Sequence, residues 1–132
     1  MANFRKVTEN FAVSPQIAPA DVAMAAEQGF VMIINNRPDG ETPGQPSSRE
    51  IASAARAAGL AYLHVPVSGR PTQDQVDETR SAVNACGGKV LAFCRSGTRS
   101  ITTWALGAPL SRDDLIGLAA AAGYDLSGLF QV

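Results

Sequence analysis

The chain has 132 residues, the size of one ordinary domain, and we expect residues 1–132 to fold as a single unit. Its 17% charged residues and formal net charge of -1 give no basic patch, so nothing indicates a nucleic-acid partner or an anionic membrane surface. It also has no apolar run long enough to span a membrane, no disulfide framework and no cluster of zinc ligands. We therefore expect a cytoplasmic protein without a metal or an organic cofactor.

Short apolar runs alternate with alanine-rich segments along the chain, a pattern typical of β-α units around a mostly parallel sheet. Strands are predicted at the runs FAV, FVMIINN, LAYLHVPV and KVLAFC. The last three hardly alternate between apolar and polar residues, so we expect both of their faces to be covered. Helices are predicted near residues 18–28, 47–58, 72–85, 99–106 and 112–122. The sequence predicts an α/β fold with a small, mostly parallel sheet of four to five strands flanked by helices.

The longest predicted loop, NNRPDGETPGQPSS, leaves the carboxyl end of the second of these strands. Open α/β sheets bind ligands at this edge, so the loop should lie near Cys94 if both strands point the same way. Within it, Arg37 is a candidate for binding an anionic substrate, and Asp39 is a candidate proton donor. The ordinary alternatives are a solvated arginine and an aspartate that closes a turn before a glycine.

Cys94 ends the last predicted strand and is followed by the polar loop RSGTRS, which runs directly into a helix. Successive amides of this loop would point inward and form an anion-binding nest at the helix N-terminus. Together with Arg99, the nest would favour the thiolate of Cys94, and Gly97 suits the backbone curl. We interpret Cys94 as a nucleophile rather than a packed cysteine, whereas Cys86 has no basic neighbour to activate it.

The stretch CRSGTRS resembles the active-site loop of rhodanese-type sulfurtransferases, in which a cysteine carries a persulfide and an arginine five positions on helps to bind the donor. With VSPQIAPADVAMAAEQGFVMIINNRPDGETPGQPSSREI and HVPVSG, the chain is similar over nearly its full length to the bacterial beta-lactamase hydrolase-like, phosphatase-like domain family. This resemblance implies the fold of the dual-specificity protein tyrosine phosphatases. Members of the family have been described both as phosphatases and as sulfurtransferases.

The chain departs from the tyrosine-type phosphatases at two places. Those enzymes have His-Cys, five residues and then Arg, whereas here Phe93 precedes Cys94 and only four residues separate Cys94 from Arg99. The acidic residue expected in the loop after the preceding strand is also missing, because that stretch contains Ser68 and Gly69. The shorter loop should close less comfortably around a tetrahedral phosphate than around a terminal sulfur. A thiolate or sulfite also leaves without a proton, whereas an alkoxide does not, so both departures favour sulfur transfer.

Our first hypothesis is a rhodanese-type sulfurtransferase that forms a persulfide on Cys94. A small sulfane-sulfur compound is the donor, and a thiol or cyanide is the acceptor. Arg99 and the loop backbone would stabilise the anionic states, and Ser100 would hydrogen-bond the thiolate. The other substrate-binding candidates in this loop are Arg95, Ser96, Gly97 and Thr98.

Two alternatives use the same loop. One is a phosphatase of dual-specificity type that forms a phosphocysteine on Cys94 from a phosphoester, with Arg99 as the phosphate clamp and Asp39 as the acid. The other is a non-enzymatic sensor of persulfides or oxyanions.

Overall fold

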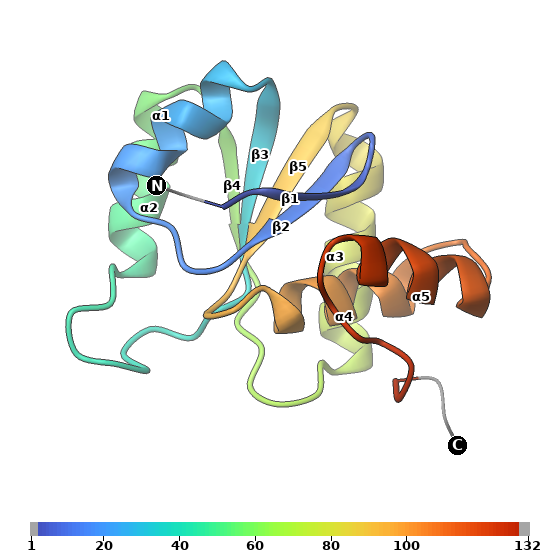
Figure 1. Cartoon of the computed structure of the whole chain (residues 1–132). Coiled ribbons are helices and arrows are strands. Elements are labelled where there is room, and N and C mark those ends of the chain that lie inside the picture. The colour runs from blue at the N-terminus through green and yellow to red at the C-terminus, as the bar shows by residue number, and fades with distance from the viewer. Residues whose placement is uncertain (1–2, 130–132) are drawn as a thin grey trace.

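The computed structural model describes residues 3–129, which form a five-stranded sheet with helices on both faces (Figure 1). The strands are β1 (Arg5–Thr8), β2 (Phe11–Ser14), β3 (Phe30–Asn35), β4 (Ala61–His64) and β5 (Lys89–Phe93). The helices are α1 (Pro19–Glu27), α2 (Ser48–Ala57), α3 (Gln73–Cys86), α4 (Thr98–Gly107) and α5 (Arg112–Ala121). The strand order is β1-β2-β5-β3-β4, and only the β1–β2 pair is antiparallel among these described strands. The predicted α/β fold with a mostly parallel sheet is confirmed.

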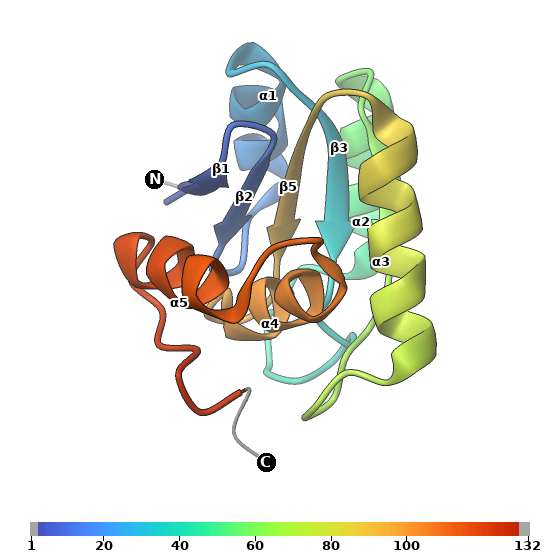
Figure 2. The ribbon, with the colours of Figure 1, turned by 90° about the vertical axis from the view of Figure 1, so that its right-hand side faces the viewer.

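The helices α1 and α2 cover one face of the sheet, while α3, α4 and α5 lie on the other (Figures 1 and 2). The central strand β5 contributes to both cores. Leu91 and Phe93 pack with the residues beneath α1 and α2, whereas Val90 and Ala92 pack on the opposite side, and all four are fully buried. A strand covered on both faces has no solvent face for polar residues, which explains the continuous apolar run VLAF after Lys89.

Two edge strands differ from the expectation drawn from the sequence. The run LAYLHVPV was expected to be covered on both faces, but β4 is the edge of the sheet, with Ala61 exposed and its other residues half-buried. The strand β1 was not predicted, because its four residues contain a single buried side chain, Val7. Short edge strands leave little trace in the hydrophobic pattern, since most of their side chains face solvent.

The helices α2 and α3 both begin at capping boxes. Ser47 Oγ accepts the amide of Glu50 at 3.1 Å, and the Glu50 carboxylate accepts the amide of Ser47 at 3.3 Å. Thr72 and Gln75 make the same reciprocal pair before α3. These bonds satisfy amides that have no partner within the helix, and they fix where α2 and α3 begin.

Candidate active site

Cys94 lies where three neighbouring parallel strands end at the same edge of the sheet. It directly follows β5 and is fully buried. Its amide donates to the carbonyl of Ser14 at the end of β2, at 3.4 Å. On the other side, the amide of Asn36, just beyond β3, donates to the carbonyl of Phe93 at 2.8 Å. The expectation that the loop after β3 lies near Cys94 is confirmed, because β3 and β5 run in the same direction.

The loop after Cys94 curls back so that one of its amides points at the sulfur. Gly97 N donates to Cys94 Sγ at 3.1 Å, and Gly97 then caps the N-terminus of α4 with a φ of 98°. That backbone conformation is in the left-handed region, which side chains disfavour. The hydroxyl of Tyr124 donates to the carbonyl of Ser96 at 2.8 Å, and a Cβ atom at Gly97 would collide with the same hydroxyl. Only glycine fits this position in the loop.

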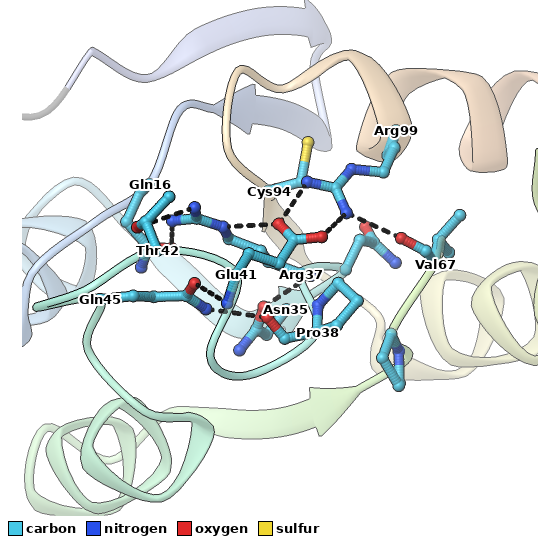
Figure 3. A network of polar contacts seen from close by, with 12 residues as sticks. Gln16, Asn35, Arg37, Pro38, Glu41, Thr42, Gln45, Val67, Cys94 and Arg99 are labelled. Carbon is cyan, nitrogen blue, oxygen red and sulfur yellow. Dashed lines mark hydrogen bonds and ion pairs between the residues drawn. The ribbon is translucent and has the colours of Figure 1, made fainter. Parts of the chain in front are cut away.

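Arg99 leaves the first turn of α4 and meets a carboxylate from the loop after β3 (Figure 3). Its Nη1 donates to Glu41 Oε2 and its Nη2 to Glu41 Oε1, both at 2.8 Å. Arg99 Nη1 also donates to the carbonyl of Val67 at 2.8 Å. Arg37 Nε donates to the same Glu41 Oε1 at 2.9 Å. One carboxylate therefore bridges two guanidinium groups beside Cys94.

Arg37 is a buried anchor of the site and not a solvated loop residue. It is 4% exposed, and its other guanidinium nitrogens donate to Gln16 Oε1 at 3.0 Å and Thr42 Oγ1 at 3.3 Å. Its backbone is held as well, because its amide donates to Asn35 Oδ1 and its carbonyl accepts from His64 Nε2, both at 2.8 Å. These bonds hold the Arg37 guanidinium and backbone in place beside the site.

Charge pairing shifts the protonation equilibria of Glu41 and Arg99. The hydrogen bond from Arg99 and then that from Arg37 lower the pKa of Glu41 from its ordinary 4.5 to about 2, against a smaller opposing effect of burial. The pKa of Arg99 is raised, first by its hydrogen bond to Glu41 and then, against desolvation, by the charge of Cys94. Both side chains are ionised at neutral pH, so Glu41 has no proton to donate in this arrangement.

The other predicted site residues make no bond to the Cys94 sulfur in the structure. Asp39 Oδ1 accepts the amide of Ser48, the first residue of α2, at 2.7 Å, so its carboxylate is engaged at the helix N-terminus. Among residues 3–129 the buried Ser100 hydroxyl has no hydrogen-bond partner, so it makes no bond to the Cys94 sulfur here. The remaining loop candidates are exposed, namely Arg95, Ser96 and Thr98.

Three residues that join the site were not singled out in the sequence. Glu41 follows Arg37 by four positions, and this pair of opposite charges in a long loop was the available signal. Gln16 and Tyr124 lie far from the cysteine loop in sequence, and no local pattern distinguishes them. Their contribution depends on how the sheet brings chain ends together.

A buried thiol, an inward-facing amide and a guanidinium converge at one point, an arrangement suited to nucleophilic attack at an oxyanion-bearing centre. In the described part of the chain, no three His, Cys, Asp or Glu side chains gather as metal ligands. Over the same residues, no helix has the length and apolarity needed to cross a membrane.

The strand order and the helices on both faces of the sheet give the chain a fold of the tyrosine phosphatase class. A solved structure of the kinase associated phosphatase has the same fold, with a TM-score of 0.69 and 15% identity, covering 89% of this chain and 80% of that one. Within this class, the sequence model of the family "Beta-lactamase hydrolase-like protein, phosphatase-like domain" matches residues 3–111. The chain belongs to this family.

Two relatives show how far the similarity extends. The beta-lactamase hydrolase-like protein of Agrobacterium fabrum is 39% identical over 127 residues, 92% of this chain and 29% of that protein. The crystal structure of a candidate phosphatase from Neisseria meningitidis Z2491 has 36% identity and a TM-score of 0.80, covering 95% of this chain and 92% of that one. This chain spans less than a third of the length of its curated relatives. These similarities favour the phosphatase alternative over the sulfurtransferase hypothesis.

Proposed function

We propose that this chain is a cysteine-dependent phosphatase domain that hydrolyses phosphate monoesters through a phosphocysteine on Cys94. The convergence of Cys94 Sγ, the Gly97 amide and the Arg99 guanidinium carries the proposal. The membership of a phosphatase-like family supports it. The substrates of the longer relatives are not carried over, because this chain corresponds to only part of them.

In the first step, the thiolate of Cys94 attacks phosphorus, the P–O bond to the leaving group breaks, and the phosphoryl group moves to sulfur. The Gly97 amide and Arg99 hold the phosphoryl oxygens and stabilise their charge. In the second step, water attacks the phosphocysteine, releasing inorganic phosphate and the thiolate. The leaving oxygen must take its proton from water when no side-chain acid is available.

The experiment that tests this proposal uses the wild-type protein and Cys94→Ser with p-nitrophenyl phosphate. The expected result is phosphate release by the wild type and none by Cys94→Ser, with a phosphorylated wild-type chain detected by intact mass after acid quenching. Binding of inorganic phosphate by Cys94→Ser serves as the control that its loop is still folded. A wild-type protein that binds phosphate but releases none from aryl phosphates would contradict the proposal.

Sulfur transfer is a second candidate, and the loop length favours it. Four residues separate Cys94 from Arg99, one fewer than in the tyrosine-type phosphatases, so fewer amides surround the bound group. In this reaction the thiolate attacks the outer sulfur of thiosulfate, the S–S bond breaks, and sulfite leaves with the electron pair. Cyanide then takes the sulfur as thiocyanate and regenerates the thiolate. A gain of one sulfur atom on Cys94 after incubation with thiosulfate, without turnover of aryl phosphates, would favour this candidate.

A further inference from the structure

A hollow of about 280 Å³ opens at the edge of the sheet where the parallel strands begin, and we call it the amino-end pocket. The residues that line it include Phe4, Lys6, Glu9, Gln28, Phe30 and Lys89. Lys89 begins β5 and Cys94 follows the other end of that strand, ~16 Å away at a rise of about 3.3 Å per residue. The amino-end pocket is therefore separate from the candidate active site.

Aromatic side chains form one wall of the amino-end pocket. Phe30 is buried, and the half-buried Phe4 meets it edge to face, with the ring centroids 5.8 Å apart. Sites for small organic ligands combine aromatic and apolar walls with a few polar groups that fix orientation, in volumes of about 300–1,000 Å³. The amino-end pocket is close to the lower end of this range, so it suits a ligand with a single aromatic ring.

Lys89 brings a half-buried cation into the pocket. Its Nζ lies over the Phe30 ring, 4.5 Å from the centroid, and donates to the carbonyl of Gln28 at 2.7 Å. Lys89 forms no ion pair with any of residues 3–129. An ammonium group has three N–H donors, so Lys89 can bind a carboxylate as well as the Gln28 carbonyl. An anion at this position would offset the cost of burying part of the charge.

Glu9 also lines the pocket, but its carboxylate is bound to Lys6. Lys6 Nζ donates to Glu9 Oε1 at 2.7 Å, and the Glu9 side chain is 87% exposed. The pKa of Glu9 is lowered first by the hydrogen bond and charge of Lys6 and, to a smaller extent, by the charge of Lys89. Glu9 is therefore ionised at neutral pH, and the two lysines and one glutamate together carry a net charge of +1.

We propose that the amino-end pocket binds a small aromatic carboxylate, with its ring against Phe4 and Phe30 and its carboxylate on Lys89. The ring would remove apolar surface from water, and the carboxylate would pair with a half-buried cation. A neutral analogue keeps the first contribution and loses the second, and a cationic analogue is repelled by both lysines. This inference goes beyond the proposed phosphatase activity and does not depend on it.

The test compares phenylacetate with its neutral isostere phenylacetamide by NMR titration of the backbone amides. Phenylacetate should shift the amides of Lys6, Phe30 and Lys89 saturably, with a dissociation constant of about 1 mM for so small a ligand. Phenylacetamide should bind at least about tenfold more weakly, a difference of ~1.4 kcal/mol. Equal binding of the two compounds, no saturation by ~10 mM phenylacetate, or shifts confined to the loop around Gly97 would overturn the inference.

Charge variants provide a second check. Lys89→Gln should weaken phenylacetate binding about tenfold, whereas Glu9→Gln should strengthen it, because it removes the opposing charge from an exposed side chain. The matched control is Arg56→Gln, which removes a positive charge from an exposed residue in the last turn of α2, outside the pocket, and should bind as the wild type does. If Lys89→Gln does not fold, Glu9→Gln still decides the question.

Unchanged or weaker binding of phenylacetate by Glu9→Gln would overturn the inference, as would unchanged binding by a folded Lys89→Gln protein. None of these measurements involves turnover at Cys94, so their outcome is independent of the phosphatase assay.

Discussion

Arg37 shows why its ion pair with Glu41 contributes to the stability of the fold. Its guanidinium is buried, and burying a charge costs free energy unless the charge is paired and hydrogen-bonded. Glu41 supplies the charge, while Gln16 and Thr42 supply neutral acceptors. Removing the Glu41 charge therefore leaves a buried cation with neutral partners only.

We predict that Glu41→Gln lowers the free energy of unfolding at neutral pH by ~1 kcal/mol, the upper part of the range for partly exposed ion pairs. The pKa of Glu41 is lower in the folded protein than its ordinary value, so its contribution is fully present above pH 4.5 and disappears as the pH falls through about 2. Urea unfolding of both proteins across this pH range measures the difference. A difference that persists at the lowest pH would show that Glu41 acts through packing and not through its charge.

Gly97→Ala should damage both the stability and the site. The φ of 98° and the adjacent Tyr124 hydroxyl leave no room for a methyl group, so we expect destabilisation by ~2 kcal/mol or more. Gly117→Ala in α5 is the matched control, because Gly117 is helical, exposed and has open space where its Cβ would lie. This control should gain roughly 0.5–1 kcal/mol. Thermal unfolding compares the two, and a Gly97→Ala protein as stable as the wild type would refute the steric argument.

At the scale of helices and strands, the sequence correctly predicted the features that depend on neighbouring residues. The helix predicted near residues 47–58 begins at the Ser47–Glu50 capping box, and the apolar run before Cys94 forms β5, because caps and continuous apolar runs act within a few residues. The strand β1 was missed and β4 was expected to be covered on both faces, because the burial of a strand depends on contacts distant in sequence. The segment after α5 that reaches the cysteine loop had no local signal at all.

Tyr124→Phe tests that segment, which lies beyond the residues matched by the family model. The ring packs beneath Arg5 and would stay in place, while the bond from the hydroxyl to the Ser96 carbonyl would be lost. We expect a loss of ~1 kcal/mol in stability. We also expect faster hydrogen exchange of the Gly97 amide, because the loop would lose the hydrogen bond that holds it at Ser96. A general loss of packing would not single out this amide. Unchanged exchange at Gly97 would show that Tyr124 does not hold the loop.

At the scale of the whole molecule, the site combines loops that follow four parallel strands. Gln16 comes after β2, Glu41 after β3, Val67 after β4, and Cys94 with Arg99 after β5. Cys94 and Arg99 were predicted because they lie together in one motif. Glu41 and Gln16 were not, because the sheet brings them there from separate parts of the chain. The assembled site places two cations and one ionised carboxylate beside the cysteine, and neither carboxylate of the loop after β3 is poised to donate a proton.

Because neither carboxylate is poised to donate a proton, we predict that the rate of the proposed phosphatase depends strongly on the leaving group. A general acid contributes ~10²–10⁴-fold when an alkoxide must leave, but little when a nitrophenolate leaves. We therefore expect kcat/KM for p-nitrophenyl phosphate to exceed that for a simple alkyl phosphate by at least ~10²-fold. Asp39→Asn should change turnover of the aryl substrate by no more than about twofold, since Asp39 is bound to the Ser48 amide, although its melting temperature should fall because that bond is weakened. Two results together would contradict this prediction: similar kcat/KM values for alkyl and aryl phosphates, and a folded Asp39→Asn protein whose turnover of the alkyl ester falls by about two orders of magnitude. They would mean that Asp39 leaves the N-terminus of α2 during turnover and serves as the acid.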